Sequence, residues 1–403
     1  MNQHRLMSGS VLGGILLIAG SCIGAGMLAL PIMTGLAGFF PALVALFIAW
    51  AFMTFSAFLL VEVCGWFSGQ VNLLSMAKES LGNVGRTIGW FTYLFLFYAL
   101  LVAYISASGG ISSAIIMDLF GFHLPAWGAS LFFTVLFGWI VYLGTRPVDL
   151  FNRILMVGLI ATYLGMIGLG IFQIHPQLFL HFAPQYTFLA LPVLVVSFGF
   201  QNMIPSLTAY MQGDLRRVRL AILGGSLLAL VVYVLWTVLV LGTVSLEGPH
   251  GILDSYQRGE EATMALHASL GSDKIAGFAR SFAFFAIVTS FLAQGLSLTH
   301  FIADGLGKLS TRKNSSWFCI LALLPPLIFA LSYPEVFFKA LSFAGGICAM
   351  ILFGIMPVFM VWVGRYKKKI LSSYHVMGGK PLLVIAFAFS LLVIGCEIVH
   401  IFS

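Results

Sequence analysis

The sequence predicts an all-helical membrane protein with eleven spanning helices, ten of which form two inverted repeats of five. Three observations support this prediction: the composition, the spacing of the apolar stretches, and interruptions in two of these stretches. Of the 403 residues, 60% are hydrophobic and only 8% are charged, and the mean hydropathy is +1.05. These values lie far outside the range of soluble globular domains.

Apolar stretches of spanning length follow one another along the chain, separated by short polar breaks. A hydrocarbon layer of about 30 Å needs about 20 apolar residues per helix. The expected spans are 11–38, 41–64, 88–116, 126–143, 153–174, 188–211, 219–243, 276–305, 316–333, 336–363 and 381–402. We expect one domain over 1–403, with a first repeat at 11–174, a second at 188–363 and an extra helix at 381–402.

The positive charges predict the orientation, because Lys and Arg are retained in cytoplasmic loops. With the N-terminus inside, only Arg258, Lys274, Arg280 and Lys339 of the twenty Lys and Arg residues fall outside. Eleven spans then put the C-terminus outside. The net charge of +7 is spread over juxtamembrane loops, so it favours anionic lipid and not nucleic acid as the partner.

The first interruption is GSCIGAGMLALP, residues 20–31, within the first span. Glycine, serine and cysteine at this depth weaken the helix and let other groups approach the backbone. One interpretation is a close helix contact, since Gly20 and Gly24 have the GxxxG spacing. The other is a helix broken for function.

A second interruption, SFGFQNMIPS at 197–206, lies midway along the sixth span. A pair of interrupted helices five spans apart is typical of a transporter with inverted repeats, whose substrate binds where both helices unwind. The sequence therefore predicts alternating access around a central site, with the bundle of spans one, two, six and seven rocking against the rest.

The residue types at the interruptions fit an amino acid zwitterion. Free amides at the start of a half-helix bind an anion, and free carbonyls at the end of one accept from a cation. We assign the amides of Gly24, Ala25 and Gly26 to the substrate carboxylate. The carbonyls of Ser21, Cys22, Ser197 and Phe198 are assigned to its ammonium, with Ile23 and Gly199 completing the two breaks.

Aromatic side chains are the candidates for reading the substrate side chain. Phe198 and Phe200 flank the second break, and Tyr98 and Tyr104 lie in the third span. Gln201 or Asn202 can bond a phenol or an indole N–H. For the two tyrosines, packing with a satisfied hydroxyl is an equal alternative.

Several stretches resemble the hydroxy and aromatic amino acid permease family, and most of all its tyrosine-specific members. These stretches are IGAGMLALP, YALLVAYIS, VDLFNR, SFGF, IPSLTAYMQGDLRR and LLPPLIFALSYP. The resemblance implies a LeuT-type fold within the amino acid, polyamine and organocation superfamily. It also implies proton-driven uptake of an aromatic amino acid across a bacterial inner membrane. One departure is Gln201, which replaces the histidine of the family's SFGFHG or SFGYHG.

The coupling ion has two sets of candidate residues. Glu62 and Asp304 are intramembrane acids that qualify as proton carriers, although both lie near span ends; Glu397 is peripheral. For sodium, Thr289 and Ser290 of span eight with the carbonyls of Gly20 and Ile23 resemble the site of sodium-coupled LeuT-type transporters. The alternative is structural: the hydroxyls of Thr289 and Ser290 donate hydrogen bonds to carbonyls of the preceding turn. Serine or threonine stays open as the substrate.

Other functional classes fit less well. A channel needs a continuous pore lined by rings of charge or carbonyls, and an enzyme needs a nucleophile with a base or a metal cluster, for which the histidines show no motif. No cofactor, metal site or disulfide framework is expected from the five cysteines. Two longer polar insertions remain. Residues 65–87, on the cytoplasmic side, predict an amphipathic helix at the membrane surface. Residues 244–275, on the outer side, predict either a lid over the entrance or an acidic surface loop.

Overall fold

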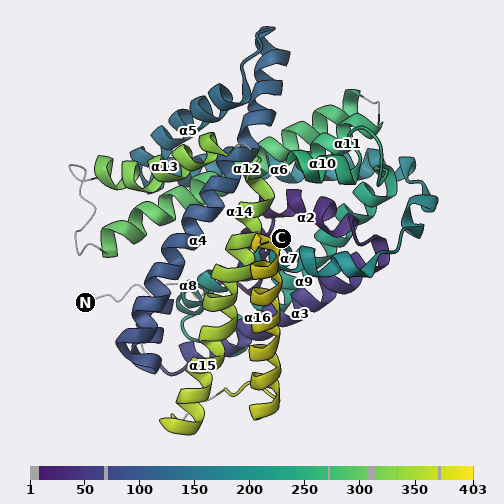
Figure 1. Ribbon diagram of the computed structural model, residues 1–403. Coiled ribbons are helices and arrows are strands. Elements are labelled where there is room, and N and C mark those ends of the chain that lie inside the picture. Colours follow the sequence, from purple (N-terminus) through teal and green to yellow (C-terminus); the bar gives the residue numbers. More distant parts are fainter. Residues whose placement is uncertain are drawn as a thin grey trace.

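The computed structural model describes residues 9–67, 71–270, 273–305, 315–333, 335–370 and 374–402. Helices and their connections make up these residues, and no β-strand occurs among them (Figure 1). The α-helices are α1 (Val11–Cys22), α2 (Gly26–Gly35), α3 (Phe39–Cys64), α4 (Leu73–Phe120), α5 (Ala126–Leu143), α6 (Thr145–Gly170), α7 (Thr187–Ser197), α8 (Ile204–Tyr210), α9 (Leu215–Thr243), α10 (Ile252–Arg258), α11 (Ala262–Leu270), α12 (Asp273–Gly305), α13 (Ser315–Ser332), α14 (Phe337–Phe343), α15 (Met356–Trp362) and α16 (Gly379–Phe402). Short 3-10 turns are η1 (Ile171–Gln173), η2 (Pro176–Leu180), η3 (Pro184–Tyr186) and η4 (Gln201–Met203), and η5 (Ala344–Ile355) and η6 (Val363–Lys367) are π-helical.

The helices agree with a multi-pass membrane protein. Within the described residues, nine helical segments are long and apolar enough to cross a membrane, and the bent pair α1 and α2 makes a tenth. The apolar helix α13 is shorter. Every expected span coincides with helical structure, whereas the count of eleven spans stays a prediction. Of the basic residues expected inside, Arg5, Lys308, Arg312 and Lys313 lie outside the described residues.

Exposed apolar side chains cover the outside of the helices. On α6, Ile154, Val157, Ile160 and Leu164 are each more than half exposed, and their spacing of three or four residues puts them on one face. A water-soluble protein rarely exposes so continuous an apolar surface. This face is therefore suited to contact with lipid.

Short polar side chains begin several helices. Asn72 accepts a hydrogen bond from the Ser75 amide at the start of α4 (2.8 Å), and Asp214 accepts from the first amides of α9. These N-caps satisfy amides that have no partner within the helix. The expected amphipathic helix forms the first part of α4, and Leu73 is buried. Gly82, with φ of 77°, bends this part away from the spanning part.

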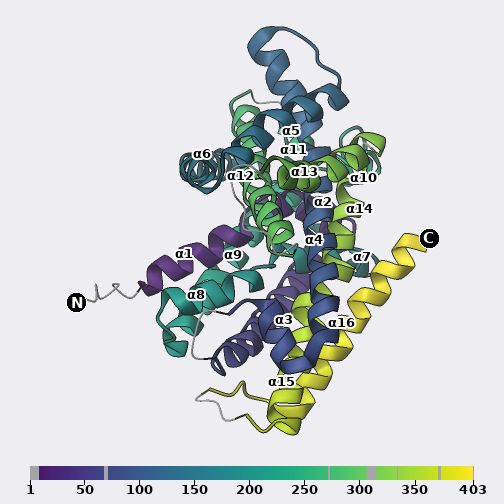
Figure 2. The same ribbon diagram turned by 90° about the vertical axis from the view of Figure 1, so that its left-hand side faces the viewer.

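The helices pack in two groups. In the first group, α9 packs along α1 and α3, and α7 packs along α2 and α3. In the second, α12 packs against α4, α5, α6 and α13. Figure 2 shows α1 beside α9 on one side of the molecule and α16 on the other. The two groups meet at the interruptions of α1–α2 and α7–α8.

Candidate binding cavity

The first interruption separates α1 from α2. α1 ends at Cys22, α2 begins at Gly26, and the two helices are bent by 59°. Ile23 leaves the helix with φ of −75° and ψ of 96°. Among the described residues, the amides of Gly24 and Gly26 have no hydrogen-bond acceptor. The start of α2 thus carries free amides, where the helix dipole favours negative charge.

Ser290 of α12 holds the start of α2 in place. Its Oγ accepts from the Ala25 amide at 3.0 Å, and its side chain also bonds the Tyr104 hydroxyl of α4. A Cβ placed on Gly24 would lie 2.5 Å from Ser290 Oγ. This position therefore has no room for a side chain unless Ser290 moves.

α9 supports α2 from the other side. Pro31 has no amide hydrogen, so the Met27 carbonyl lacks its usual helical donor. The Trp236 indole N–H donates to this carbonyl at 2.9 Å. A Cβ on Gly26 would lie 3.2 Å from Ser197 Oγ, so α2 also passes close to the end of α7. The GxxxG interpretation finds less support, because the atoms nearest to Gly24 belong to a side chain and not to a helix backbone.

The second interruption follows Ser197, the last residue of α7. Phe198 and Phe200 are completely buried, and the Phe198 ring lies edge-on to Tyr233 at 4.9 Å between centroids. Gln201 is also buried, and its Nε2 donates to the Met53 carbonyl of α3 at 3.0 Å. These side chains anchor the second break to neighbouring helices.

Tyr233 of α9 joins the two breaks. Its hydroxyl lies 2.6 Å from the Cys22 carbonyl oxygen and 2.7 Å from that of Ser197. These are the last carbonyls of α1 and α7, so the negative ends of two helix dipoles converge on one point. Tyr233 was not predicted from the sequence, because a single tyrosine in an apolar span carries no pattern.

A cavity of about 360 Å³ lies between the breaks, a volume in the range of small-molecule sites. Most of the predicted site residues line it, namely Gly20, Ser21, Cys22, Ile23, Gly24, Ala25, Gly26, Tyr104, Ser197, Gly199, Asn202, Thr289 and Ser290. Tyr98, Phe198, Phe200, Gln201, Glu62 and Asp304 do not line it.

The aromatic part of the cavity wall comes from α4 and η5. Tyr93, Phe97 and Tyr104 of α4 and Phe353 of η5 line the cavity. The Tyr93 ring lies 5.9 Å from Phe97 and 6.2 Å from Phe353 between centroids. An aromatic side chain has four rings to pack against here. Of these four aromatic residues, Tyr104 alone was predicted from the sequence.

Tyr98 has the packing role that the sequence left open. Its hydroxyl donates to the Leu321 carbonyl of α13 at 2.8 Å. Pro325, four residues later, has no amide hydrogen, so this carbonyl lacks a donor within its helix. Tyr98 instead lines a second cavity, of about 920 Å³, between α4, α13, α14 and α16.

Two amide side chains in the wall of the first cavity carry an oxygen without a partner. Among the described residues, Asn152 Oδ1 and Gln294 Oε1 are buried and lack a hydrogen bond. Thr289, by contrast, donates back to the Phe285 carbonyl at 2.8 Å, as the structural alternative expected. Its hydroxyl oxygen keeps lone pairs for a cation. Buried acceptors without donors favour a ligand that carries N–H or O–H groups.

The candidate coupling acids lie away from the cavity. Glu62 is completely buried and accepts from Arg365 Nε at 2.6 Å, the Val376 amide at 2.8 Å and His375 Nδ1 at 3.2 Å. Asp304 is exposed near the end of α12. Glu62 is therefore the centre of an ion-pair cluster between α3, η6 and the segment before α16.

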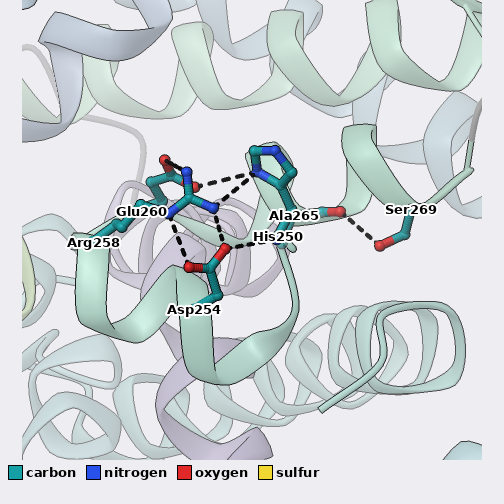
Figure 3. A network of polar contacts seen from close by, with 6 residues as sticks. All are labelled: His250, Asp254, Arg258, Glu260, Ala265 and Ser269. Carbon is teal, nitrogen blue, oxygen red and sulfur yellow. Dashed lines mark hydrogen bonds and ion pairs between the residues drawn. The ribbon is translucent and has the colours of Figure 1, made fainter. Parts of the chain in front are cut away.

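Residues 245–270, called the α10–α11 segment below, pack on α2. Figure 3 shows its polar network, in which Arg258 Nε donates to Asp254 at 3.1 Å and Arg258 Nη1 lies 3.5 Å from Glu260. His250 donates its amide to Asp254 at 2.7 Å. The hydrogen bond from Arg258 lowers the pKa of Asp254. Much of the segment's charge is thus paired within the segment.

Glu261, in the same segment, differs from Asp254 and Glu260, which are partly exposed, because its side chain is buried. It accepts from the Thr263 amide at 2.6 Å and from Thr263 Oγ1 at 2.7 Å. Burial raises the pKa of Glu261 to about 7. The carboxyl group is therefore close to half-protonated at neutral pH.

Comparisons with known proteins agree with this arrangement. The model of the tryptophan/tyrosine permease family matches residues 7–397. The tyrosine-specific transport system 1 of Haemophilus influenzae is 34% identical over 94% of both chains. The tryptophan-specific transport protein of the same organism is 32% identical, over 97% of this chain and 96% of its own. The low affinity tryptophan permease of Escherichia coli is 28% identical, over 98% and 96%. These matches confirm the family resemblance, and the chain belongs to the tryptophan/tyrosine permease family, whose members are transporters and not enzymes.

Proposed function

We propose that this protein is a secondary active transporter that carries an aromatic amino acid, above all tyrosine, into the cell together with protons. The observation that carries the proposal is the convergence of both interrupted helices on one cavity with an aromatic wall. Relatives that transport tyrosine or tryptophan support the substrate class. Serine or threonine would leave the ring-lined side of the cavity unfilled.

The binding mode follows from the polar groups around the cavity. The substrate ammonium binds the carbonyls of Cys22 and Ser197, where two helix dipoles end. The carboxylate binds the free amides of Gly24 and Gly26. The amide of Ala25 is bonded to Ser290 in this structure, so it joins the carboxylate only if Ser290 turns away. The side chain packs against Phe97, and the amide side chains of Asn152 and Gln294 in the cavity wall are the candidates to bond its polar end.

The fold that we propose is the LeuT-type arrangement of two inverted five-helix repeats, with the N-terminus inside and the C-terminus outside. In this orientation Leu17, Asn152 and Gln294, which line the cavity, lie on the inner side of the breaks. The α10–α11 segment covers α2 on the outer side. The structure then corresponds to an inward-facing state, and rocking of the α1, α3, α7 and α9 group opens the outer side.

Coupling needs an ion that binds one state more tightly than the other. We propose Glu62 and Asp304 as alternative proton sites. Glu62→Gln and Asp304→Asn are tested for proton-driven accumulation and for tyrosine exchange without a gradient. Loss of accumulation with exchange retained identifies the coupling residue, and unchanged accumulation in both variants removes both residues from the mechanism.

The function is tested by uptake of labelled tyrosine into sodium-free proteoliposomes with an inward proton gradient. We expect concentrative uptake that a protonophore abolishes. Unlabelled tryptophan or phenylalanine should reduce this uptake by competition. Uptake that starts only when sodium is added would move coupling to Thr289, Ser290 and the carbonyls of Gly20 and Ile23. Competition by serine or threonine alone would contradict the aromatic substrate.

A further inference from the structure

We infer that Tyr233 is the positioning residue that makes the site select for a ligand with an ammonium group. This inference rests on the proposed function. The Tyr233 hydroxyl has a single hydrogen, yet it lies within hydrogen-bond distance of two carbonyl oxygens, those of Cys22 and Ser197. One hydrogen cannot fully satisfy two buried acceptors.

The two carbonyls have lost their helical donors. In a continuous helix the Cys22 carbonyl would accept from the amide of Gly26, and the Ser197 carbonyl from that of Gln201. Neither bond exists among the described residues. The two carbonyls therefore lack at least one donor between them. Each oxygen also has a second lone pair that can accept a hydrogen bond from a ligand. Buried carbonyls that lack donors favour a ligand that supplies N–H groups, and a positive charge adds to the attraction.

The approach directions separate the roles of protein and ligand. Cys22 and Ser197 line the cavity, whereas Tyr233 is completely buried and is not part of the cavity wall. The hydroxyl thus reaches the carbonyls from behind and leaves their cavity side open. By bonding both, it also links the end of α1 to the end of α7. The two acceptors are held at one spacing, which is what an ammonium with several donors requires.

The ring of Tyr233 is held independently of its hydroxyl. It packs edge-on against Phe198, a contact that needs no polar group. Tyr233→Phe therefore removes the link between the two carbonyls and retains the packing. Tyr163→Phe is the matched control, because the Tyr163 hydroxyl also donates to a carbonyl of α9, that of Val232, at 2.9 Å, but does not line the cavity.

The test measures equilibrium binding of tyrosine and of its analogue without the amino group, 3-(4-hydroxyphenyl)propanoate, to the purified protein. For Tyr233→Phe we expect tyrosine to bind about tenfold more weakly, because the two carbonyls are no longer held at the spacing that the ammonium requires. Binding of the analogue should not change. Tyr163→Phe should leave both affinities unchanged.

A second variant guards against misfolding of the first. Phe198→Leu keeps the Tyr233 hydroxyl but removes the Phe198 ring that packs against Tyr233. We expect this variant to lose tyrosine affinity, but not analogue affinity, by a smaller factor than Tyr233→Phe. Equal losses for both ligands, or unchanged tyrosine binding, would overturn the role of Tyr233. If the wild-type protein bound neither tyrosine nor tryptophan, the proposed function itself would fail, and this inference with it.

Discussion

The two helix interruptions look alike in sequence but are built differently. At the first break, small residues expose the backbone, and contacts such as that of Ser290 Oγ with Ala25 reach the main chain. At the second break, the buried side chains of Phe198, Phe200 and Gln201 anchor the chain to its surroundings. The first break is therefore suited to ligand contact through its backbone. The second contributes less backbone to the cavity and more packing to the fold.

The largest expected effect is at Gly24. A Cβ there would lie 2.5 Å from Ser290 Oγ, and overpacking of this kind costs about 1–3 kcal/mol. Gly24→Ala should also misplace the free amides that bind the carboxylate, and losing one hydrogen bond to a charged group weakens tyrosine binding about tenfold or more; Gly24→Leu should abolish binding. Gly26→Ala should lose less, since its Cβ would lie 3.2 Å from Ser197 Oγ. The measurement is equilibrium binding of labelled tyrosine to folded protein.

Gly277 provides the control for this prediction. It lies on α12, the helix that carries Ser290, and a Cβ there meets nothing within 4 Å. Gly277→Ala should bind tyrosine like the wild type. Wild-type affinity in folded Gly24→Leu protein would show that the first break is not the binding site.

A second comparison, between Phe198 and Phe97, separates packing from binding. Phe198→Ala removes a completely buried ring and should lower the free energy of unfolding by about 3–5 kcal/mol. Phe97→Ala, at the cavity wall, should weaken tyrosine binding more than Phe198→Ala does, and should lower the melting temperature less. Thermal unfolding and binding measured on both variants check this contrast. The reverse pattern would place the aromatic pocket at the second break after all.

The α10–α11 segment packs on α2, which belongs to the first of the two broken helices, and its Glu261 gives that region a pH dependence. Burial raises the pKa of Glu261 from its ordinary 4.5 to about 7, so the folded form binds its proton more tightly than the unfolded form. The stabilisation is therefore present below about pH 4.5 and is lost as the pH rises through about 7. The loss is on the order of 3 kcal/mol at most.

Hydrogen exchange of the α11 amides as a function of pH measures this effect. Protection in the wild type should fall between about pH 4.5 and 7, and Glu261→Gln should show a flatter profile. A parallel decline in both proteins would assign the pH dependence to other groups.

The smallest effect is expected at Gln201, where the family histidine is replaced. Its amide bonds Met53 and does not line the cavity. Gln201→Met keeps the volume, so it should cost less than about 1.5 kcal/mol of stability. Tyrosine affinity should stay within about twofold of wild type. A large affinity loss with normal melting would mean that Gln201 reads the substrate in another state.

Much of the fold follows from composition and hydropathy, because lipid-facing helices need long apolar stretches that are visible in the sequence. The breaks at Gly24 and Gly199 were also predictable, since glycine next to polar residues stands out in an apolar span. The direction of side chains was harder to predict. Tyr98 and Tyr104 are six residues apart on one helix and so face different sides, and only contacts with α13 and α12 decide which tyrosine meets the cavity.

Tertiary contacts account for what the sequence analysis missed. Tyr233, Phe97 and Phe353 are ordinary residues of apolar spans, and their role depends on which helices lie beside the breaks. The aromatic pair Phe198 and Phe200 lies next to Gly199 in sequence, yet packing against α9 and its neighbours turns both rings away from the cavity. Proximity along the chain is a poor guide to a site whose wall includes residues of α1, α2, α4, α6, α7, α12 and α14.

An experimental structure of the protein with bound tyrosine would show whether the substrate binds at the two breaks. We expect tyrosine in the cavity between the breaks, with its ammonium at the carbonyls of Cys22 and Ser197 and its carboxylate at the amides of Gly24 and Gly26. Tyrosine bound instead in the larger cavity beside Tyr98, or with its charged groups away from both breaks, would contradict this expectation.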